Sequence, residues 1–345
     1  MSLLERVSHF FDKYRQNDGK GEHILKLLRQ NISSSFKKSS IVKYTKYQEV
    51  PEDEFSGWLS LLFEEHGLER LTTEQTEDIR QQFCVCLKRI EESSCVALWE
   101  YWLRPVLNPI SALLIVDVQN DFISGSLALK NCPAGEDGEE VVSVIQELLS
   151  KKMFSVVAYS FDWHPSDHCS FVDNVSLYPL HSSSQVTAEK AKVFDVVVYD
   201  KIPIIDQVLW PRHCVMNSWG AELHKDLTPP SDKDITVKKG KNPEVDCYSA
   251  FWNNGDCTQT SLFVDLLKRG VTDLYVCGLA FDVCVKETSI DAVGQGFKTH
   301  VIVDACRGVA PEGIAKTKEE FVKNGIVLLE SEKVKDALRD KKEIM

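Results

Sequence analysis

ALLIVDVQNDF, residues 112–122, is the stretch of sequence that decides the fold of this chain of 345 residues. Five consecutive apolar residues lead directly into Asp117. A short continuous apolar run bounded by polar residues is typical of a strand buried on both faces of a parallel sheet. In such sheets ligands bind beyond the carboxyl ends of the strands, so the end of this strand is also a candidate site.

The remainder of the chain alternates between strand-like and helix-like stretches. The strand-like runs are FSVVAYS (154–160), DITVKK (234–239), DLYVCGL (273–279), HVIVDA (300–305) and IVLLE (326–330), and the helix-like stretches are VVSVIQELLS (141–150), SLFVDLLKRG (261–270), CVKETSIDAVGQG (284–296) and KTKEEFVKNG (316–325). Apolar strands interleaved with amphipathic helices indicate a parallel sheet covered on both faces. We therefore predict an α/β fold over residues 109–345, a three-layer, doubly wound, mainly parallel sheet.

Residues 1–108 have a different character, and the prolines of RPVLNPIS (104–111) mark the boundary. FSGWLSLLFEEHG (55–67) and TTEQTEDIRQQFCVCLKRI (72–90) place apolar residues three and four apart, which predicts helices. FFDKYRQNDGKGEHILKLL (10–28) resembles an EF-hand, but the glycine that the sixth loop position requires is misplaced. We predict a small all-helical, degenerate EF-hand-like domain in which calcium binding is doubtful.

Composition and charge narrow the class of partner. The formal net charge is −12, of which −2 falls before residue 109 and −10 after it, and no long basic run is present. This balance argues against nucleic acid and anionic membranes and favours a small-molecule partner. The first residues, MSLLERVSHFFDKY, lack the apolar core of a signal peptide, and no run has a bilayer-spanning length.

Eleven unevenly spaced cysteines indicate free thiols in a reducing compartment. We therefore expect a cytoplasmic protein, with the nucleus as a second location. A homo-oligomer stays open as an alternative.

FDWHPSDH, residues 161–168, contains a candidate metal site just past one predicted strand. Asp162 and His164 stand two residues apart, so in extended backbone both side chains project to the same side. A carboxylate with imidazoles suits zinc, manganese or iron, and an open catalytic site needs a third protein ligand. The competing interpretation is a surface turn built by the proline, serine and aspartate that follow.

Two further histidines complete this set. His213, in WPRHC (210–214), is the candidate for the third ligand, because it is flanked by proline and tryptophan as His164 is. His168 is either a fourth ligand or a group that holds a bound water.

GLAFDVCVKET, residues 278–288, supplies a candidate nucleophile. Cys284 follows a strand and a tight loop and opens a helix, whose N-terminus stabilises a thiolate. The N–H groups of such a loop can also hold the oxyanion that forms when a thiolate attacks a carbonyl. The competing interpretation, an inert core thiol, is the one we assign to Cys277 in the preceding strand.

An acid and an amine accompany this thiol. Burial at the end of the first strand raises the pKa of Asp117 and suits it to act as a base, unless it is a turn or helix-capping residue, as Asp121 is expected to be. A lysine of KKG (238–240), beside the same edge, would lower the pKa of the thiol, unless it is solvated.

Together these motifs strongly resemble the nicotinamidases, the metal-dependent branch of the isochorismatase-like cysteine hydrolases. The resemblance covers residues 110–330 and rests on DVQNDF with GSLAL, DWHPSDHCSF, WPRHCV, KKG followed by CYSAF, and GLAFDVCVKET, in this order. Carried over residue by residue, it implies a catalytic triad of Asp117, Lys239 and Cys284, and leaves Lys238 as a bystander.

The resemblance also implies the rest of the site. One divalent metal ion, zinc ahead of manganese or iron, would be held by Asp162, His164 and His213, with His168 as an additional neighbour. The backbone N–H groups of Ala280 and Cys284 would form the oxyanion hole, next to a cis peptide between Leu279 and Ala280. Substrate-ring contacts would be Phe122, Leu127, Trp210 and Tyr248, for each of which core packing is the alternative.

The implied reaction is hydrolysis of nicotinamide to nicotinate and ammonia, which feeds NAD salvage. The metal holds the pyridine nitrogen, Asp117 accepts the thiol proton, the thiolate attacks the amide carbon, and a water activated by the metal or by Asp117 hydrolyses the thioester. Three features depart from the bacterial pattern: a short loop after DVQNDF, an insertion at 169–207 expected to lie over the site, and the helical extension, which animal members also carry.

Two alternatives remain. One is a metal-free relative, such as an isochorismatase or a carbamoyl amidase, in which the DxH and histidine cluster would be absent. The other is a calcium-responsive or partner-binding protein that acts through its first 108 residues.

Overall fold

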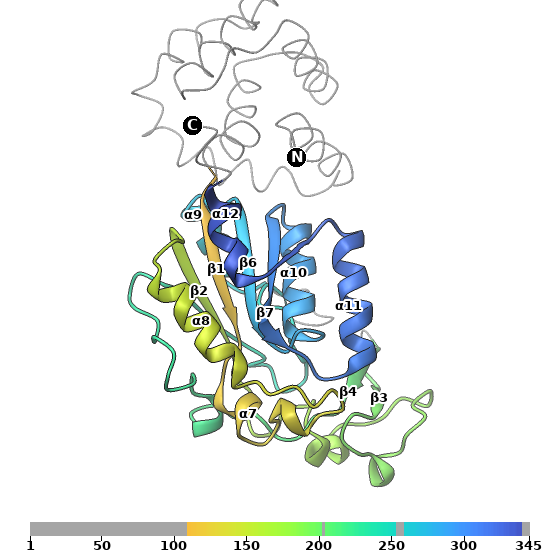
Figure 1. Ribbon diagram of the computed structural model, residues 1–345. Coiled ribbons are helices and arrows are strands. Elements are labelled where there is room, and N and C mark those ends of the chain that lie inside the picture. The colour runs from red at the N-terminus through yellow and green to blue at the C-terminus, as the bar shows by residue number, and fades with distance from the viewer. Residues whose placement is uncertain (1–108, 202–203, 253–258, 340–345) are drawn as a thin grey trace, which may run out of the picture. The chain divides into compact units, whose positions relative to one another are not determined.

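The computed structural model describes residues 109–201, 204–252 and 259–339, and within them Ile110–Leu338 form one compact unit (Figure 1). Its strands are β1 Ser111–Val116, β2 Val156–Asp162, β3 Val196–Tyr199, β4 Ile205–Val208, β5 Ile235–Lys239, β6 Asp273–Leu279, β7 Lys298–Arg307 and β8 Val327–Leu329. Its helices are α7 Asn120–Ile123, α8 Glu140–Ser150, α9 Leu262–Lys268, α10 Cys284–Gly294, α11 Pro311–Lys323 and α12 Val334–Arg339. The predicted helical domain at 1–108 lies outside the described residues.

Six of these strands form one parallel sheet in the order β5-β2-β1-β6-β7-β8. The central strand β1 is buried along its whole length, as its unbroken apolar sequence predicts. From β1 the chain builds outward to β2 and β5 on one side and then to β6, β7 and β8 on the other. The strand order reverses between β1 and β6. The connections that leave the carboxyl ends of these two neighbouring strands therefore run in opposite directions.

Helices cover both faces of the sheet, which confirms the predicted three-layer α/β fold. Both α8 and α10 pack against β6 and β7 without extensive contact with each other, as helices on opposite faces of a sheet do. In Figure 1, α8 crosses in front of the strands. Its buried residues are Val141, Val142, Ile145 and Leu148, spaced one, three and three apart, as expected for a helix with one apolar face.

The insertion at 169–207 carries structure that the sequence pattern did not predict. Strands β3 and β4 form a separate antiparallel pair. Val197 and Tyr199 of β3 pack with Cys169, Val175 and Leu209 in a small core of their own. These strands are only four residues long, too short for their alternation to be distinguished from loop sequence.

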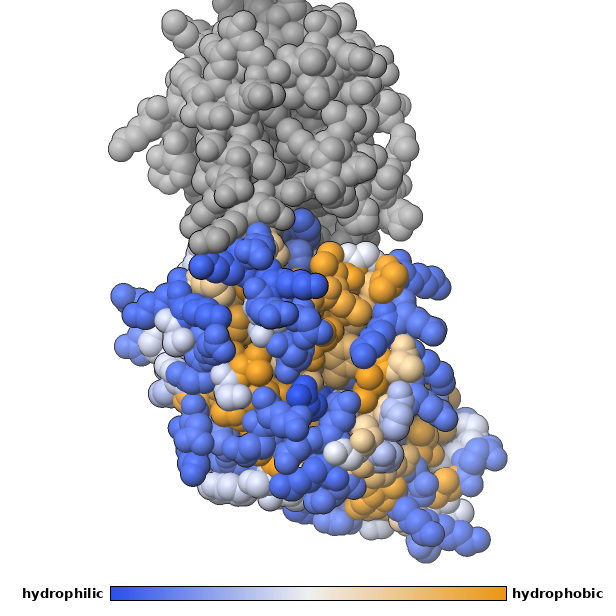
Figure 2. All heavy atoms as spheres, in the orientation of Figure 1, coloured by the Kyte–Doolittle hydropathy of each residue, from blue (hydrophilic) through white to orange (hydrophobic). Residues whose placement is uncertain are grey.

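The face of the described unit shown in Figure 2 is largely hydrophilic, with apolar side chains gathered in patches between the charged ones. Among the described residues, no helix combines the length and the apolar character needed to cross a bilayer.

Candidate active site

Four side chains from separate segments meet at the carboxyl edge of the sheet, around the reversal point. Asp117 follows β1, Asp162 ends β2, Lys239 ends β5 and Cys284 begins α10 after β6. All four are buried. Because parallel strands end at the same edge, residues far apart in the sequence are brought together there, as the strand-end motifs predicted.

Lys239 lies at the centre of this cluster. Its Nζ lies 3.0 Å from Asp117 Oδ2 and 2.5 Å from Asp162 Oδ1. It also donates to the carbonyl of Cys247 at 2.8 Å and lies 3.4 Å from Cys284 Sγ. The lysine therefore ties the predicted acid and the predicted nucleophile to the carboxylate that faces the histidines.

The two carboxyl groups titrate differently despite sharing this lysine. Burial raises the pKa of Asp117, and the attraction of Lys239 only partly offsets that effect. Burial also opposes ionisation of Asp162, but there Lys239 and His164 outweigh it and hold the pKa well below its ordinary value. Asp162 is thus a fixed negative charge, and Asp117 is the carboxylate poised to accept a proton.

The Cys284 thiol corrects one expectation. Lys239 does favour the thiolate, yet burial is the larger effect, and the net pKa of Cys284 lies well above its ordinary value. The resting sulfur is therefore a protonated thiol, and its proton must leave as the attack occurs. Asp117 is placed to accept it, because the Cys284 thiol hydrogen-bonds to the Asp117 carboxylate, an interaction that also raises the pKa of the thiol.

The loop before the nucleophile adopts the shape that the resemblance implied. A cis peptide joins Leu279 to Ala280. Cys284 is the first residue of α10, so its backbone N–H has no acceptor within the helix. The N–H groups of Ala280 and Cys284 are therefore placed at the end of β6, where the predicted oxyanion hole belongs.

The candidate metal ligands converge beside this cluster. Asp162 Oδ2 lies 3.6 Å from His164 Nε2 and 3.7 Å from His213 Nε2. The other nitrogen of each ring faces a backbone carbonyl: His164 Nδ1 is 3.0 Å from Gly240 O, and His213 Nδ1 is 2.7 Å from Pro211 O. In the neutral rings, carbonyls of this kind hold the Nδ1–H tautomer, so that each Nε2 has a lone pair to offer an ion.

The buried charges also fit a divalent cation. Asp117, Asp162 and Asp246 are buried and contribute three negative charges when all are ionised, whereas Lys239 contributes one positive charge. Burial lowers the pKa of His164 but Asp162 raises it by more, so without an ion this ring draws a proton toward the excess negative charge. Buried charge is stable only when it is compensated. A dication bound among Asp162 and the two histidine Nε2 atoms would balance it.

Two structural residues hold the ligands in place. Gly240 has φ +66° and leaves no space for a side chain, because a Cβ there would lie 2.4 Å from Cε1 of His164. The carboxylate of Asp121 accepts from Ser126 N at 3.0 Å and from Cys214 N at 2.7 Å. Asp121 is thus the turn residue that was expected, and it also fixes the backbone next to His213.

His168 lies in this cluster but is arranged differently from the other histidines. Its ring stands 4.1 Å, centroid to centroid, from that of His164. Nδ1 contacts Ser170, whereas Nε2 is buried with no hydrogen-bond partner among the described residues. Burial, together with His164, lowers the pKa of His168 to about 3, so the ring is neutral near pH 7.

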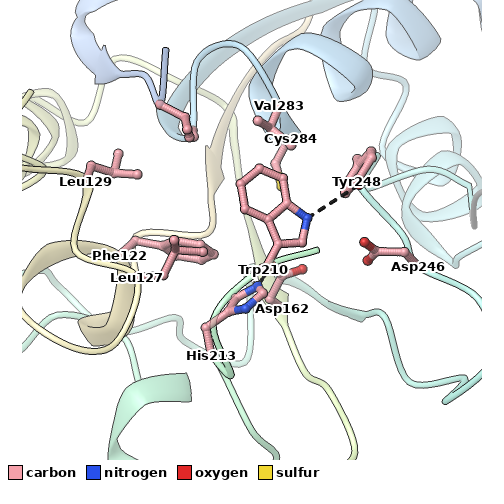
Figure 3. Close-up of a pocket in the computed structure, with 12 residues that line it drawn as sticks. Phe122, Leu127, Leu129, Asp162, Trp210, His213, Asp246, Tyr248, Val283 and Cys284 are labelled. Atoms are coloured by element: carbon pink, nitrogen blue, oxygen red, sulfur yellow. Dashed lines mark hydrogen bonds and ion pairs between the residues drawn. The ribbon is translucent and has the colours of Figure 1, made fainter. Parts of the chain in front are cut away.

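A pocket opens between Cys284 and the metal-ligand side chains (Figure 3). In Figure 3, Val283 and Cys284 lie at one end of it, and Asp162 and His213 at the other. Its wall includes all four predicted ring-contact residues, Phe122, Leu127, Trp210 and Tyr248. Trp210 Nε1 donates to the Tyr248 hydroxyl at 3.4 Å.

Three residues of the site were missed by sequence reasoning. Ser160 Oγ donates to Asp117 Oδ1 at 2.7 Å. The Gln119 amide donates to Asp162 O at 2.8 Å and accepts from Asp162 N at 2.9 Å, which locks the ends of β1 and β2 together. Asp246 lines the pocket, two residues before Tyr248, yet its position in a polar loop resembles that of a surface acid.

Other assignments from the sequence agree with the structure. The ammonium group of Lys238 lies over the Trp163 ring, 3.4 Å from its centroid, whereas Lys239 points into the site. Cys277 is fully buried in β6, and burial raises its pKa well above the ordinary value, as expected for an inert core thiol.

The insertion at 169–207 supports the back of the site. Phe171 packs edge-on against His164 and His213, with ring centroids 5.7 and 5.6 Å apart. Gln207 donates to Asp246 Oδ2 at 2.8 Å. The described part of the insertion therefore contributes a wall behind the histidines.

Comparison with known proteins gives one consistent result. A family model described as the isochorismatase domain matches residues 180–333. The nicotinamidase of Escherichia coli is 40% identical over 58% of this chain and 84% of its own length. A solved nicotinamidase/pyrazinamidase of Acinetobacter baumannii superposes with a TM-score of 0.55 at 35% identity, covering 65% of this chain and 97% of that one.

A yeast nicotinamidase solved with the inhibitor nicotinaldehyde superposes with a TM-score of 0.53 at 29% identity. It covers 64% of this chain and all of its own. The similarity thus spans at least 84% of each of these relatives and leaves more than a third of this chain without a counterpart in them.

Proposed function

The chain belongs to the nicotinamidase family of isochorismatase-like cysteine hydrolases, and we propose that it hydrolyses nicotinamide to nicotinate and ammonia with Cys284 as the nucleophile. Nicotinate produced in this way feeds NAD salvage. The observation that carries the proposal is the convergence of Asp117, Lys239 and Cys284 at one end of the pocket with three candidate metal ligands at the other.

Proton transfer accompanies formation of the thioester. Asp117 accepts the thiol proton as Cys284 Sγ attacks the amide carbon, because only the thiolate is nucleophilic and burial keeps the resting thiol protonated. Asp117 then returns the proton to the departing nitrogen, and ammonia leaves. Water attacks the resulting thioester and its proton passes to Asp117. The carbon–sulfur bond then breaks to release nicotinate, and Asp117 returns that proton to the Cys284 sulfur.

Lys239 and the two backbone N–H groups stabilise charge during these steps. Lys239 remains protonated, since Asp117 and Asp162 outweigh the effect of burial and raise its pKa well above the ordinary value. The N–H groups of Ala280 and Cys284 would donate to the amide oxygen as it becomes negative. Phe122, Leu127, Trp210 and Tyr248 would enclose the pyridine ring between them.

Asp162, His164 and His213 would hold one divalent ion, for which zinc is our first candidate and manganese or iron the alternatives. When bound, this ion supplies a Lewis acid that the pyridine nitrogen can ligate, so that the ring is held with its amide toward Cys284. We assign to these residues the orientation of the ring and not the activation of the thiol.

Ammonia release from nicotinamide by the purified protein tests the proposal. We expect turnover by the wild type, a loss of about 10,000-fold or more in Cys284→Ala, and loss after chelation that added metal restores. Cys277→Ala, which removes a buried thiol outside the pocket, is the matched control and should retain activity. Undiminished turnover by Cys284→Ala would reject the nucleophile, and turnover after complete metal removal would reject the metal's role.

Three expectations from the sequence remain predictions beside this proposal. They are a cytoplasmic location with the nucleus as a second site, a homo-oligomeric state, and a domain boundary at residue 108.

A further inference from the structure

Three histidines surround the proposed metal site, but their Nδ1 atoms have neighbours of opposite polarity. Carbonyl oxygens of Gly240 and Pro211 face the Nδ1 atoms of His164 and His213. A carbonyl can only accept a hydrogen bond, so each of these Nδ1 atoms carries a hydrogen, and in the neutral ring each Nε2 presents a lone pair. His164 and His213 can therefore each act as a metal ligand.

His168 has the opposite arrangement. The backbone N–H of Ser170 donates to His168 Nδ1 at 3.3 Å, and the Ser170 hydroxyl lies 2.7 Å from the same atom. A backbone N–H can only donate, so Nδ1 of His168 is an acceptor, and in the neutral ring the hydrogen is on Nε2. An N–H at Nε2 has no lone pair to offer an ion.

This Nε2–H needs an acceptor, because Nε2 is buried with no hydrogen-bond partner among the described residues. Ring nitrogens of His164 and His168 and a carboxylate oxygen of Asp246 lie within 4.8 Å of one another. At that limit, the gap between the three atoms holds a point about 2.8 Å from each of them, which is a hydrogen-bond length. Since Ser170 already occupies Nδ1 of His168, Nε2 is the nitrogen that faces the gap.

Asp246 supplies the acceptor on the other side. It is 4% exposed, and its two oxygens accept from Cys247 N and from Gln207 Nε2, both at 2.8 Å. The Tyr248 hydroxyl also hydrogen-bonds to this carboxylate. A carboxylate offers about four acceptor positions, so capacity for one water remains.

We propose that His168 is not a metal ligand, and that its Nε2–H and the Asp246 carboxylate hold one ordered water at the edge of the metal site. This assignment rests on the metal site of the proposed function. A water suits the pair because its oxygen accepts from His168 while one of its hydrogens is donated to Asp246. A metal ion in the same gap would instead meet the hydrogen on Nε2.

The tautomers provide the first test, in full-length protein labelled with ¹⁵N only at histidine. Long-range ¹H–¹⁵N correlation spectra should show the Nε2–H form for His168 in metal-free protein and, once zinc is bound, the Nδ1–H form for His164 and His213, each assigned from a glutamine variant. The His168 spectrum is recorded on metal-free protein, so an inactive enzyme would reject the proposed function without deciding this inference. An Nδ1–H tautomer at His168 would overturn it.

Zinc X-ray absorption of the loaded protein gives the second test, because it counts the imidazoles bound to the ion. We expect two in the wild type, two in His168→Gln and one in His213→Gln. Three in the wild type would make His168 a ligand and overturn the proposal, and this count requires no variant to fold.

The water is tested by a crystal structure of the zinc-loaded, full-length protein. An ordered oxygen within hydrogen-bond distance of both His168 Nε2 and the Asp246 carboxylate is expected. A gap without such an oxygen, or one that contains metal, would overturn the assignment.

Discussion

At the scale of single residues, the site is a buried charge cluster that depends on one lysine. Lys239 is 2% exposed and contacts two carboxylates. The cost of burying this ammonium group is recovered only because both partners are within reach. By the same reasoning, we expect its neighbour Lys238, which lies over Trp163 at the surface, to contribute little to the stability of the protein.

Replacing this lysine should therefore destabilise the protein. We expect Lys239→Met to lower the free energy of unfolding of the metal-free protein by about 3–5 kcal/mol, because Asp117 and Asp162 are left as buried, facing charges. Urea denaturation measures the change. Lys238→Met is the matched control and should cost about 1 kcal/mol or less. Equal losses in the two variants would contradict this account.

The fall in rate on the acid side of the pH–rate profile should follow protonation of the Asp117 carboxylate. Its pKa is raised above 3.8 by burial, and only the ionised form, present above that raised pKa, can accept the thiol proton. The rate should therefore fall as the pH drops through the pKa of Asp117. The hydrogen bond from Ser160 lowers this pKa, so Ser160→Ala should move the limb to higher pH.

Measurements of kcat/KM across pH, with metal content determined at each point, provide this check. A limb that stays in place in Ser160→Ala, while the metal stays bound, would show that a group other than Asp117 controls it.

At the scale of elements, the site depends on how each strand ends. After β5 the chain turns through Gly240, which has φ +66° and places its backbone against the His164 ring. After β1, Asp117 itself has φ +49°, in the left-handed region where aspartate is tolerated. These two turns help to bring the side chains at the ends of β1 and β5 together at the site.

Gly240→Ala should weaken metal binding because its Cβ would meet the imidazole of His164 at 2.4 Å. We expect a loss of about 10–100-fold or more in metal affinity, measured by competition with a chelator. Gly135→Ala is the matched control, since Gly135 has φ +65° but no atom within 4 Å of the added Cβ. If both variants lose the same affinity, backbone strain and not the contact with His164 is responsible.

At the scale of the whole molecule, metal binding and folding should be linked. The ligands come from β2 and from the WPRHC segment, and the ion would also neutralise the buried excess of negative charge. A group that binds only the folded chain stabilises it by mass action.

Chelation should therefore lower the Tm. At free metal about 1,000-fold above Kd, binding adds about 4 kcal/mol, which corresponds to roughly 10 °C for a unit of this size. Differential scanning calorimetry with and without chelator measures the shift. His213→Gln, which lacks a ligand, should show little difference between the two conditions, whereas an unchanged wild-type Tm would contradict the linkage.

Much of the fold was predictable because its signals are local. The apolar run before Asp117 and the later strand–helix alternation depend on residues near one another in the chain, and they match the observed elements from β1 to β8. The short β3–β4 pair was missed, because four residues carry too little periodicity to be recognised. The candidate nucleophile, the acid and the ligands Asp162 and His164 were found because each follows a predicted strand, whereas His213 was found from its proline- and tryptophan-flanked motif.

The amino-acid sequence by itself determined which segments become strands and which chemical groups stand at their ends. Only the tertiary structure decided that burial outweighs Lys239 in setting the pKa of Cys284, that Ser160 and Asp246 belong to the site, and that His168 faces a donor where His164 faces a carbonyl. Desolvation and hydrogen bonding depend on contacts between distant segments, and such contacts leave no periodic trace in the sequence.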